Sequence, residues 1–577
     1  MSWIDSHLLS LVVFLPLAGA LLGALLPRSE GAQHKGIALV TTIVTFLMSI
    51  LLWTGFKPGA GWQFEQKAEW APSLGFSYHV GLDGVALLLF MLTTFLGPIV
   101  ILSAWRFTKD REKEFFLALL VLQTAMMGTL ASLDLVLFYV FWEAMLIPMY
   151  LLIGIWGSEK RIYAAVKFFL FTFVGSVLML LAIFYVWSQS GVGAARTFDF
   201  PTLLAQANFT PQVQFWLFLA FALAFAIKVP VWPLHTWLPD AHTEAPAAGS
   251  VILAGVMLKL GTFGFIRYAM PLFPQAALQA APCIAALGVI GVVYGSLMCM
   301  AQTDLKRLIA YSSVAHLGFV MTGLAAMTPE ATQGAVLQMV NHGVSTGALF
   351  MMIGYLYERT HTRDIANYGG LAKITPRFAA IFLVVTLSSI GLPGTNGFIG
   401  EFLILIGTFS AKLGTFTVGS MLIQKAWILS ALGATGVILG AVYMLTLYQR
   451  VFLGPVTHEK NRSLKDLSGR ELTTLIPLIA AILVIGVYPM PMLDVIKAPV
   501  DEVIQKVNGP AQRAPRLGGQ LRQRMLDLNA QGAPAQRQPD SAQIQRGPDS
   551  PQAPRVMPMP HVLVPNRAPQ AEQPAKQ

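Results

Sequence analysis

The sequence predicts an all-α polytopic membrane protein that crosses the bilayer about fourteen times, and three observations support this. First, the 577 residues are 55% hydrophobic and only 12% charged, with a mean hydropathy of +0.62, far from the composition of a soluble domain. Second, the apolar residues fall into runs long enough to cross about 30 Å of hydrocarbon. Third, Lys and Arg residues gather in alternate loops between these runs.

The apolar runs divide evenly between the two halves of the chain. The first seven lie at residues 8–26, 37–55, 82–105, 115–132, 134–157, 163–187 and 213–239. The other seven lie at residues 247–270, 283–301, 312–328, 333–357, 378–411, 426–449 and 472–490. Because no basic residue precedes the first run, we expect it to be a retained span rather than a removed signal peptide.

The distribution of basic residues predicts the orientation. The loops that follow odd-numbered segments hold most of the Lys and Arg residues outside the C-terminal tail, as cytoplasmic loops do. One missed or additional segment in the middle would scramble this alternation, so the segment count and the orientation support each other. We therefore expect a multi-pass protein of a bacterial inner membrane with its N-terminus on the periplasmic side.

The chain divides into a membrane domain at residues 1–500 and a tail at residues 508–577. The tail is rich in Pro, Gln, Ala and Arg, which predicts disorder. It holds nine Lys/Arg against four Asp/Glu, so half of the net charge of +10 belongs to it and no nucleic-acid partner is indicated. The two cysteines, Cys283 and Cys299, have no partner set at metal-ligand spacing, so we expect neither a metal site nor a disulfide.

Four ionisable side chains fall inside predicted membrane segments: Glu143, Lys228, Lys259 and Glu401. Each costs on the order of 3 kcal/mol at the bilayer centre if it is ionised and unpaired. One structural ion pair between helices is the simpler interpretation for any single residue, but such pairs contribute little stability and can be replaced by apolar side chains. A proton path needs them, because burial disfavours charged lysine whereas a nearby carboxylate favours it. The set therefore predicts proton transfer.

Two of these residues lie beside predicted helix breaks. Lys228 precedes Pro230 and Pro233 in segment 7, and Glu401 follows the run 391–394 (GLPG) in segment 12. Discontinuous helices at corresponding places indicate a transporter site. Segments 4–8 and 9–13 would then form two inverted five-helix repeats. The repeats match Glu143 with His316, Lys167 with His342, and Lys228 with Glu401, by helix order alone.

Histidines supply groups that titrate near neutral pH. His316 and His342 suit a proton relay between the lysines and Glu401, although a hydrogen-bonded core role is an alternative for each. His235 and His242, near the break in segment 7, are candidates for feeding protons from the cytoplasmic side, with simple capping and loop hydrogen bonds as the alternative. Asp134 is expected to cap segment 5.

Motifs for harvesting chemical energy are missing from the sequence. It contains no phosphate-binding GxxxxGK[ST] run, no GxGxxG after a strand and no cysteine set for an iron-sulfur cluster. We therefore expect no cofactor in this chain, and any active pumping must be driven through partner proteins.

Four runs together resemble the proton-channel subunits shared by respiratory complex I (NADH:quinone oxidoreductase) and Mrp-type cation/proton antiporters. They are residues 141–154 (FWEAMLIPMYLLIG), 229–261 (VPVWPLHTWLPDAHTEAPAAGSVILAGVMLKLG), 304–318 (DLKRLIAYSSVAHLG) and 391–402 (GLPGTNGFIGEF). The likeness spans about residues 1–500. It implies that Glu143 and Lys228 form a coupling pair, that Lys259 is central, and that Glu401 connects to the periplasmic exit.

Glutamate at position 401, where most sister subunits have lysine, makes the chain resemble the chain M type (subunit 4 in mitochondrial naming). That resemblance implies a proton-translocating subunit of complex I, flanked by two sister antiporter-like subunits. NADH, FMN, iron-sulfur clusters and quinone would then be held by other subunits. A Mrp-type Na+/H+ antiporter subunit is the main alternative, and a hydrogenase or formate-oxidising complex and an inactive scaffold are the others.

Overall fold

The computed structural model describes residues 3–29, 31–59, 61–107, 110–206, 208–413 and 426–509, so the tail beyond residue 509 lies outside the described residues. Among them, thirteen helices are long and apolar enough to cross a membrane. The twelfth predicted segment is a pair of shorter apolar helices, Pro376–Ser389 and Asn396–Phe409. The all-α membrane fold with fourteen apolar segments is therefore confirmed.

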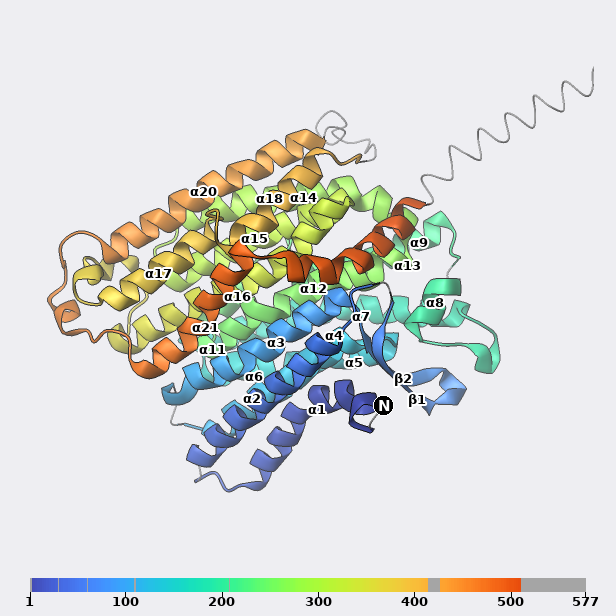
Figure 1. The fold of residues 1–577 in the computed structure, drawn as a ribbon, viewed down its shortest axis with the longest axis horizontal. Coiled ribbons are helices and arrows are strands. Elements are labelled where there is room, and N and C mark those ends of the chain that lie inside the picture. Colours follow the sequence, from blue (N-terminus) through green and yellow to red (C-terminus); the bar gives the residue numbers. More distant parts are fainter. Residues whose placement is uncertain are drawn as a thin grey trace, which may run out of the picture. The chain divides into compact units, whose positions relative to one another are not determined.

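The helices run roughly side by side through the bundle (Figure 1). In the first half these are α1 Trp3–Leu25, α2 Gly31–Gly55, α3 Gly84–Ser103, α4 Glu112–Ala131, α5 Leu135–Ala144, α6 Leu146–Trp156, α7 Arg161–Gln189, α8 Phe200–Gln206, α9 Pro211–Lys228 and α10 Trp237–Glu244. In the second half these are α11 Ala247–Ile252, α12 Leu258–Gly264, α13 Met270–Leu272, α14 Pro274–Met300, α15 Leu305–Ala326, α16 Pro329–Thr360, α17 Pro376–Ser389, α18 Asn396–Phe409, α20 Ala426–Phe452 and α21 Gly469–Val487.

Both predicted helix breaks are present. The seventh segment stops at Lys228, passes through residues 229–236 without regular helix, and resumes as α10. The twelfth segment stops at Ser389 and resumes at Asn396. Gly391 has a φ of +72° and Gly394 a φ of +91°, a left-handed backbone that favours glycine, which explains the glycines of this run.

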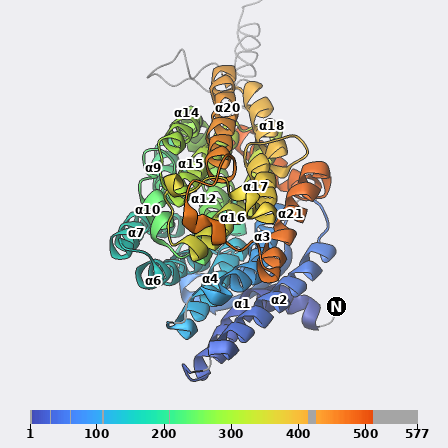
Figure 2. The same ribbon diagram turned by 90° about the vertical axis from the view of Figure 1, so that its left-hand side faces the viewer.

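The eighth segment is irregular in a way that the sequence does not predict. Two π-helical turns, Leu253–Met257 and Phe265–Ala269, lie on either side of α12. In the most apolar stretch of this segment, of α15 and of α16, every residue is buried inside the bundle. In the corresponding stretch of α2 only 28% of the residues are buried. Figure 2 accordingly places α12 and α16 near the middle of the bundle and α2 at its margin. These three segments are therefore shielded from lipid.

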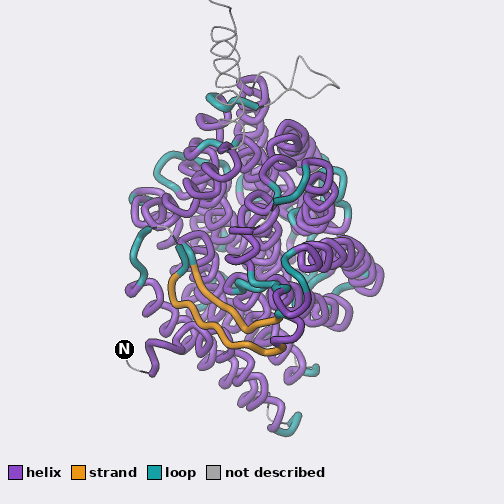
Figure 3. Tube along the Cα trace, turned by 90° about the vertical axis from the view of Figure 1, so that its right-hand side faces the viewer, coloured by secondary structure: helices purple, strands orange, loops and turns teal. Residues whose placement is uncertain are grey.

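Asp134 caps α5, as predicted, because its carboxylate accepts hydrogen bonds from the backbone N–H groups of Val136 and Leu137. The same carboxylate accepts the backbone N–H of Ser77. Ser77 belongs to an antiparallel hairpin, β1 Gln63–Ala71 and β2 Phe76–Leu82, which the sequence does not predict. Figure 3 shows both strands together at the end of the bundle opposite to that seen in Figure 2.

A further helix at residues 490–509 follows α21. The predicted membrane domain ends at residue 500, within this helix, and the predicted tail begins at residue 508. Lys506 donates from Nζ to the carbonyl of Leu204 at 2.6 Å, and Asn508 donates to the carbonyl of Met327 at 3.3 Å. The helix is thus tied to α8 and to the end of α15.

Candidate functional site

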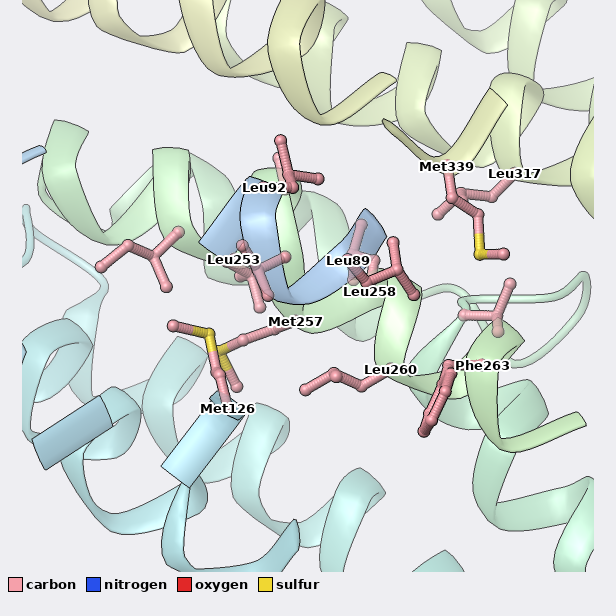
Figure 4. Packing of buried hydrophobic residues seen from close by; sticks show 14 of the residues in the cluster. Leu89, Leu92, Met126, Leu253, Met257, Leu258, Leu260, Phe263, Leu317 and Met339 are labelled. Carbon is pink, nitrogen blue, oxygen red and sulfur yellow. The ribbon is translucent and has the colours of Figure 1, made fainter. Parts of the chain in front are cut away.

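Lys259 lies in the most deeply buried part of the bundle and is 0% exposed. Its helix, α12, carries Leu258 and Leu260 into the apolar cluster of Figure 4, which also includes Leu89, Met126, Leu317 and Met339 from α3, α4, α15 and α16. The ammonium group of Lys259 donates to the carbonyl of Ala254 in the preceding π-helical turn. A π-helical turn disturbs the regular hydrogen bonding of a helix, and such turns are frequent at functional sites. The turn therefore provides an acceptor where the sequence alone shows only apolar residues.

Four predicted site residues form a continuous row from Lys259 to Glu401. The Nζ of Lys259 lies 2.7 Å from Nδ1 of His342. The ring of His342 lies 5.6 Å, centroid to centroid, from the ring of His316. The Nδ1 of His316 lies 3.1 Å from Oε1 of Glu401, and both side chains are less than 10% exposed. Acid-base groups thus follow one another at hydrogen-bond distance or across one ring-to-ring step.

Glu143 and Lys228, the predicted coupling pair, do not form an ion pair in this structure. The Nζ of Lys228 and Oε1 of Glu143 are both buried and have no hydrogen-bond partner among the described residues. The Lys228 ammonium instead lies 5.0 Å from the centre of the Trp142 ring, at the distance of a cation–π contact. The two groups still interact electrostatically. The pair is therefore open, with Lys228 Nζ and Glu143 Oε1 available for a new partner while Ser176 interacts with the Glu143 carboxylate.

His235 lies in the break of the seventh segment and does not join the row. It is 3% exposed, and its ring makes an edge contact with Tyr294 at 5.1 Å. His242, further along, stacks on Phe350 at 4.6 Å and has no partner on either ring nitrogen. It lies within electrostatic range of Lys259 on one side and Lys306 on the other. His242 is thus better placed than His235 to reach the row.

A cavity of about 240 Å³ lies at the ends of the membrane segments, where the Lys/Arg-rich loops begin. Lys306, Glu358 and Arg363 supply its charged lining. The Lys306 ammonium donates to the carbonyl of Ala245, at the turn that joins α10 to α11. A cavity of this size with charged groups in its lining has room for several waters. Lys306 does not stand out in the sequence, because it lies at the boundary of a loop and a helix.

Further polar contacts involve residues outside the row. Lys167, which the predicted repeats match with His342, pairs with Asp240 at 2.7 Å, and Arg307 lies 3.5 Å from the same carboxylate. Gln338 donates to Glu401 at 3.1 Å. A polar residue repeating on one face of α16 (Gln338, Asn341, His342) is the signal that could have identified it. Groups of three or more metal-ligating side chains are absent from the described residues.

Broken membrane helices and a buried row of Lys, His and Glu define a class, the antiporter-like proton-conducting membrane proteins. Residues 132–425 match the family model described as NADH:quinone oxidoreductase/Mrp antiporter, transmembrane. NADH-quinone oxidoreductase subunit M of Rhodobacter capsulatus is 46% identical over 512 residues, covering 86% of this chain and 96% of that protein. The chain belongs to this family, and within it to the subunit M (chain 4) type.

Solved structures agree with this placement. A chain of respiratory complex I from Thermus thermophilus superposes with a TM-score of 0.77 at 34% identity, covering 86% of this chain and 99% of that one. A chain of the Mrp complex from Dietzia has a TM-score of 0.72 at 21% identity, covering 91% of this chain and 57% of that one, which shows the fold alone. The chain is therefore closer to complex I than to the Mrp antiporters.

Proposed function

We propose that this chain conducts protons across the membrane through Lys259, His342, His316 and Glu401, in that order. The observation that carries the proposal is the row of acid-base groups, with one ring-to-ring step between His342 and His316, in the buried interior of the bundle. Each member both accepts and donates a proton, as a relay requires. A purely structural cluster would gain little stability from the two further ionisable groups beyond the first pair.

Protons reach the row through the cavity that Lys306 lines. Waters in this cavity exchange protons with the side of the membrane where the Lys/Arg-rich loops lie, which we take as the cytoplasm. His242 has two free ring nitrogens and lies within electrostatic range of both Lys306 and Lys259. It connects the cavity to the row, and His235 serves the neighbouring break around Lys228.

The open pair of Glu143 and Lys228 is the driving switch. A carboxylate favours the charged form of a nearby lysine, whereas an apolar site disfavours it. Movement of the Glu143 charge toward or away from Lys228 therefore loads or releases a proton there. The change in charge passes to Lys259, the next buried lysine along the chain, and starts the relay toward Glu401.

The chain is a subunit of NADH:quinone oxidoreductase, a translocase, and the redox chemistry takes place outside it. NADH, FMN, iron-sulfur clusters and quinone are held by partner subunits, and two sister antiporter-like subunits flank this one in the membrane arm. We place the complex in a bacterial inner membrane with the N-terminus of this chain on the periplasmic side, because the basic loops then face the cytoplasm.

The relay is tested with Lys259→Ala in the assembled complex. We expect NADH:quinone turnover and proton uptake in inverted vesicles to fall at least tenfold, because the central site of the relay is lost. Lys57→Ala, in an exposed loop residue, is the control and should leave both rates unchanged. A Lys259→Ala complex that assembles on a native gel and pumps at the wild-type rate would exclude the relay. Loss of assembly alone would favour a packing role for Lys259.

A further inference from the structure

Gln338 on α16 is buried beside the last member of the row. The side chain is 2% exposed, and its Nε2 lies 3.1 Å from Oε1 of Glu401. The orientation of this amide follows from its neighbours. The backbone carbonyl of Asn396 can only accept, so Asn341 must present its Nδ2 to it, at 2.7 Å. The same Nδ2 lies 3.2 Å from Oε1 of Gln338, which leaves the Gln338 N–H groups for Glu401.

The two oxygens of Glu401 therefore face different surroundings. Oε1 is contacted by both Gln338 and His316 at 3.1 Å. Oε2 lies on the side of the helix break, so close that a Cβ on Gly391 would be 2.9 Å from it. Oε1 thus faces the other members of the row, and Oε2 faces the break at residues 390–395.

Asn396 connects α16 to the broken twelfth segment through hydrogen bonds. It stands at the first position of α18, donates from Nδ2 to the backbone carbonyl of Asn341 at 3.2 Å, and accepts from Ser388 at 2.5 Å. Asn341 and Asn396 thereby hold α16 against the start of α18. The position of Glu401 relative to Gln338 is fixed by these bonds rather than by apolar packing alone.

We propose that Gln338 is a positioning residue that directs proton transfer through Glu401, an inference that rests on the proposed relay. The N–H bond of His316 breaks and an O–H bond forms on Oε1 of Glu401. The carboxyl group then turns about its Cγ–Cδ bond, which carries the proton to the side of the break and brings the bare oxygen to Gln338. His316 recovers a proton from His342. The O–H bond then breaks and the proton passes to a water on the side of the break, which restores the carboxylate. Gln338 holds the oxygen that faces the relay ready to accept the next proton from His316.

The experiment compares the pH profiles of coupled turnover in purified, vesicle-reconstituted complex. Gln338→Met keeps the size of the side chain without the donor, and Gln338→Asn keeps an amide that is one methylene too short. Both should lower turnover at neutral pH about threefold to tenfold. Both should also move the acidic limb of the profile upward, because the proposed step needs an ionised Glu401 to accept from His316 and a donor to that ionised carboxylate is lost.

Gln123→Met is the matched control. Gln123 is also a buried glutamine on a membrane helix, 3% exposed, but it has no hydrogen bond from its Nε2 and no place in the relay. Its variant should keep the wild-type profile. A second expectation concerns the double variant: Gln338→Met should add no further loss to Glu401→Gln, because both act through one carboxyl group.

Two results would overturn the inference. One is assembled Gln338 variants with the wild-type pH profile, and the other is failure of both variants to assemble, which would make Gln338 a structural residue. The proposed relay is judged separately, by Glu401→Gln itself. If Glu401→Gln loses coupled turnover while Gln338→Met does not move the profile, only the role of Gln338 is wrong. If Glu401→Gln pumps normally, the relay is wrong at its last step.

Discussion

A charged side chain in a membrane protein must find hydrogen-bond partners inside the bundle, and the buried residues of this chain do so in unequal measure. Lys259 has a backbone carbonyl and an imidazole as partners. Lys228 has no hydrogen-bond partner among the described residues, and its ammonium lies over the rings of Trp142 and Phe168 within electrostatic range of Glu143. A lysine with strong partners is held in place, whereas one without them responds to any charge that approaches. The difference suits Lys259 to relaying protons and Lys228 to sensing the switch.

The identity of the last residue of the row gives a sharp test of the relay. Glu401→Gln should abolish most coupled turnover, because an amide cannot take up a proton at neutral pH. Glu401→Lys should keep part of it, because lysine also exchanges a proton. Proton uptake per NADH oxidised in sealed vesicles distinguishes the three forms.

A fixed counter-ion would behave in the opposite way. If Glu401 served only to pair with His316, the neutral glutamine would be tolerated better than a lysine of the wrong sign. Higher coupled turnover for Glu401→Gln than for Glu401→Lys, with equal assembly on a native gel, would therefore assign Glu401 to a structural ion pair.

At the level of residues, intramembrane ionisable groups can be found from sequence because their cost in lipid is general. Lys259, His342, His316 and Glu401 were all predicted as site residues, and the structure brings them into one row. Their partners could not be predicted in the same way. Every residue has a backbone carbonyl, so the sequence does not single out that of Ala254. A neutral amide such as Gln338 costs less free energy to bury than a charged group, so its presence in a membrane helix does not by itself indicate a function. Only the three-dimensional contacts distinguish these groups.

At the level of elements, the helix breaks position the charged groups. The break in the seventh segment begins directly after Lys228, and the break in the twelfth segment ends five residues before Glu401. These breaks could be predicted because Pro and Gly disrupt helices by their own chemistry. The π-helical turns around α12 could not be predicted, because their residues are ordinary helix formers. We attribute the turns to contacts with neighbouring helices, which the sequence does not show. The hairpin was missed because its first strand lacks an alternating apolar pattern.

The glycine at the second break should be sensitive to substitution. Gly391→Ala places a Cβ at a φ of +72° and 2.9 Å from Oε2 of Glu401. We expect a loss of about 1 kcal/mol in local stability and a several-fold fall in coupled turnover, because the backbone is strained and the carboxyl group is displaced. Turnover and proton uptake of reconstituted vesicles measure the effect.

Gly440→Ala is the matched control for this substitution. Gly440 lies within α20, and a Cβ built on it meets no atom within 4 Å. Its alanine variant should pump like the wild type, since alanine favours helix and fits the space. Equal behaviour of the two alanine variants would show that the conformation at Gly391 does not matter for function.

The hairpin is attached to the bundle by a carboxylate. Asp199 accepts from Lys67 at 2.8 Å and lies 2.6 Å from His79 Nδ1. Burial alone raises the pKa of Asp199, but hydrogen bonds from His79, Lys67 and Thr202 outweigh burial and hold the pKa below its usual value. A lowered pKa means that ionised Asp199 stabilises the folded hairpin above pH ~4, and that this contribution is lost as the pH falls below that value.

Asp199→Asn should therefore loosen the hairpin by about 2 kcal/mol at neutral pH, the size of one or two hydrogen bonds to a charged group. Faster amide hydrogen exchange at residues 63–82 of the intact complex is the expected observation. Between pH 6 and 8 the wild-type protection should stay constant, since Asp199 is ionised throughout. Unchanged protection in the variant would show that backbone pairing with Leu133 is enough to hold the hairpin.

At the level of the whole molecule, the row of acid-base groups crosses from one predicted five-helix unit to the other. Lys259 belongs to the last segment of the first unit, whereas His342, His316 and Glu401 come from the second. The helices at this junction, α12, α15 and α16, are also those most completely shielded from lipid. Charged groups at such a place exchange protons with each other more readily than with the surroundings.

The division of the chain at its C-terminal end leads to a last prediction. The described residues end at residue 509, and the row of acid-base groups lies wholly within them. The tail is rich in Pro, Gln and Arg and poor in apolar side chains, so it contributes little to a packed core. Removing residues 511–577 should therefore leave assembly, NADH:quinone turnover and proton uptake at wild-type values.

A truncation that also removes residues 490–510 takes away the contacts of Lys506 and Asn508 and should impair assembly. Loss of the complex on a native gel after the shorter truncation would reveal a subunit contact within the tail itself.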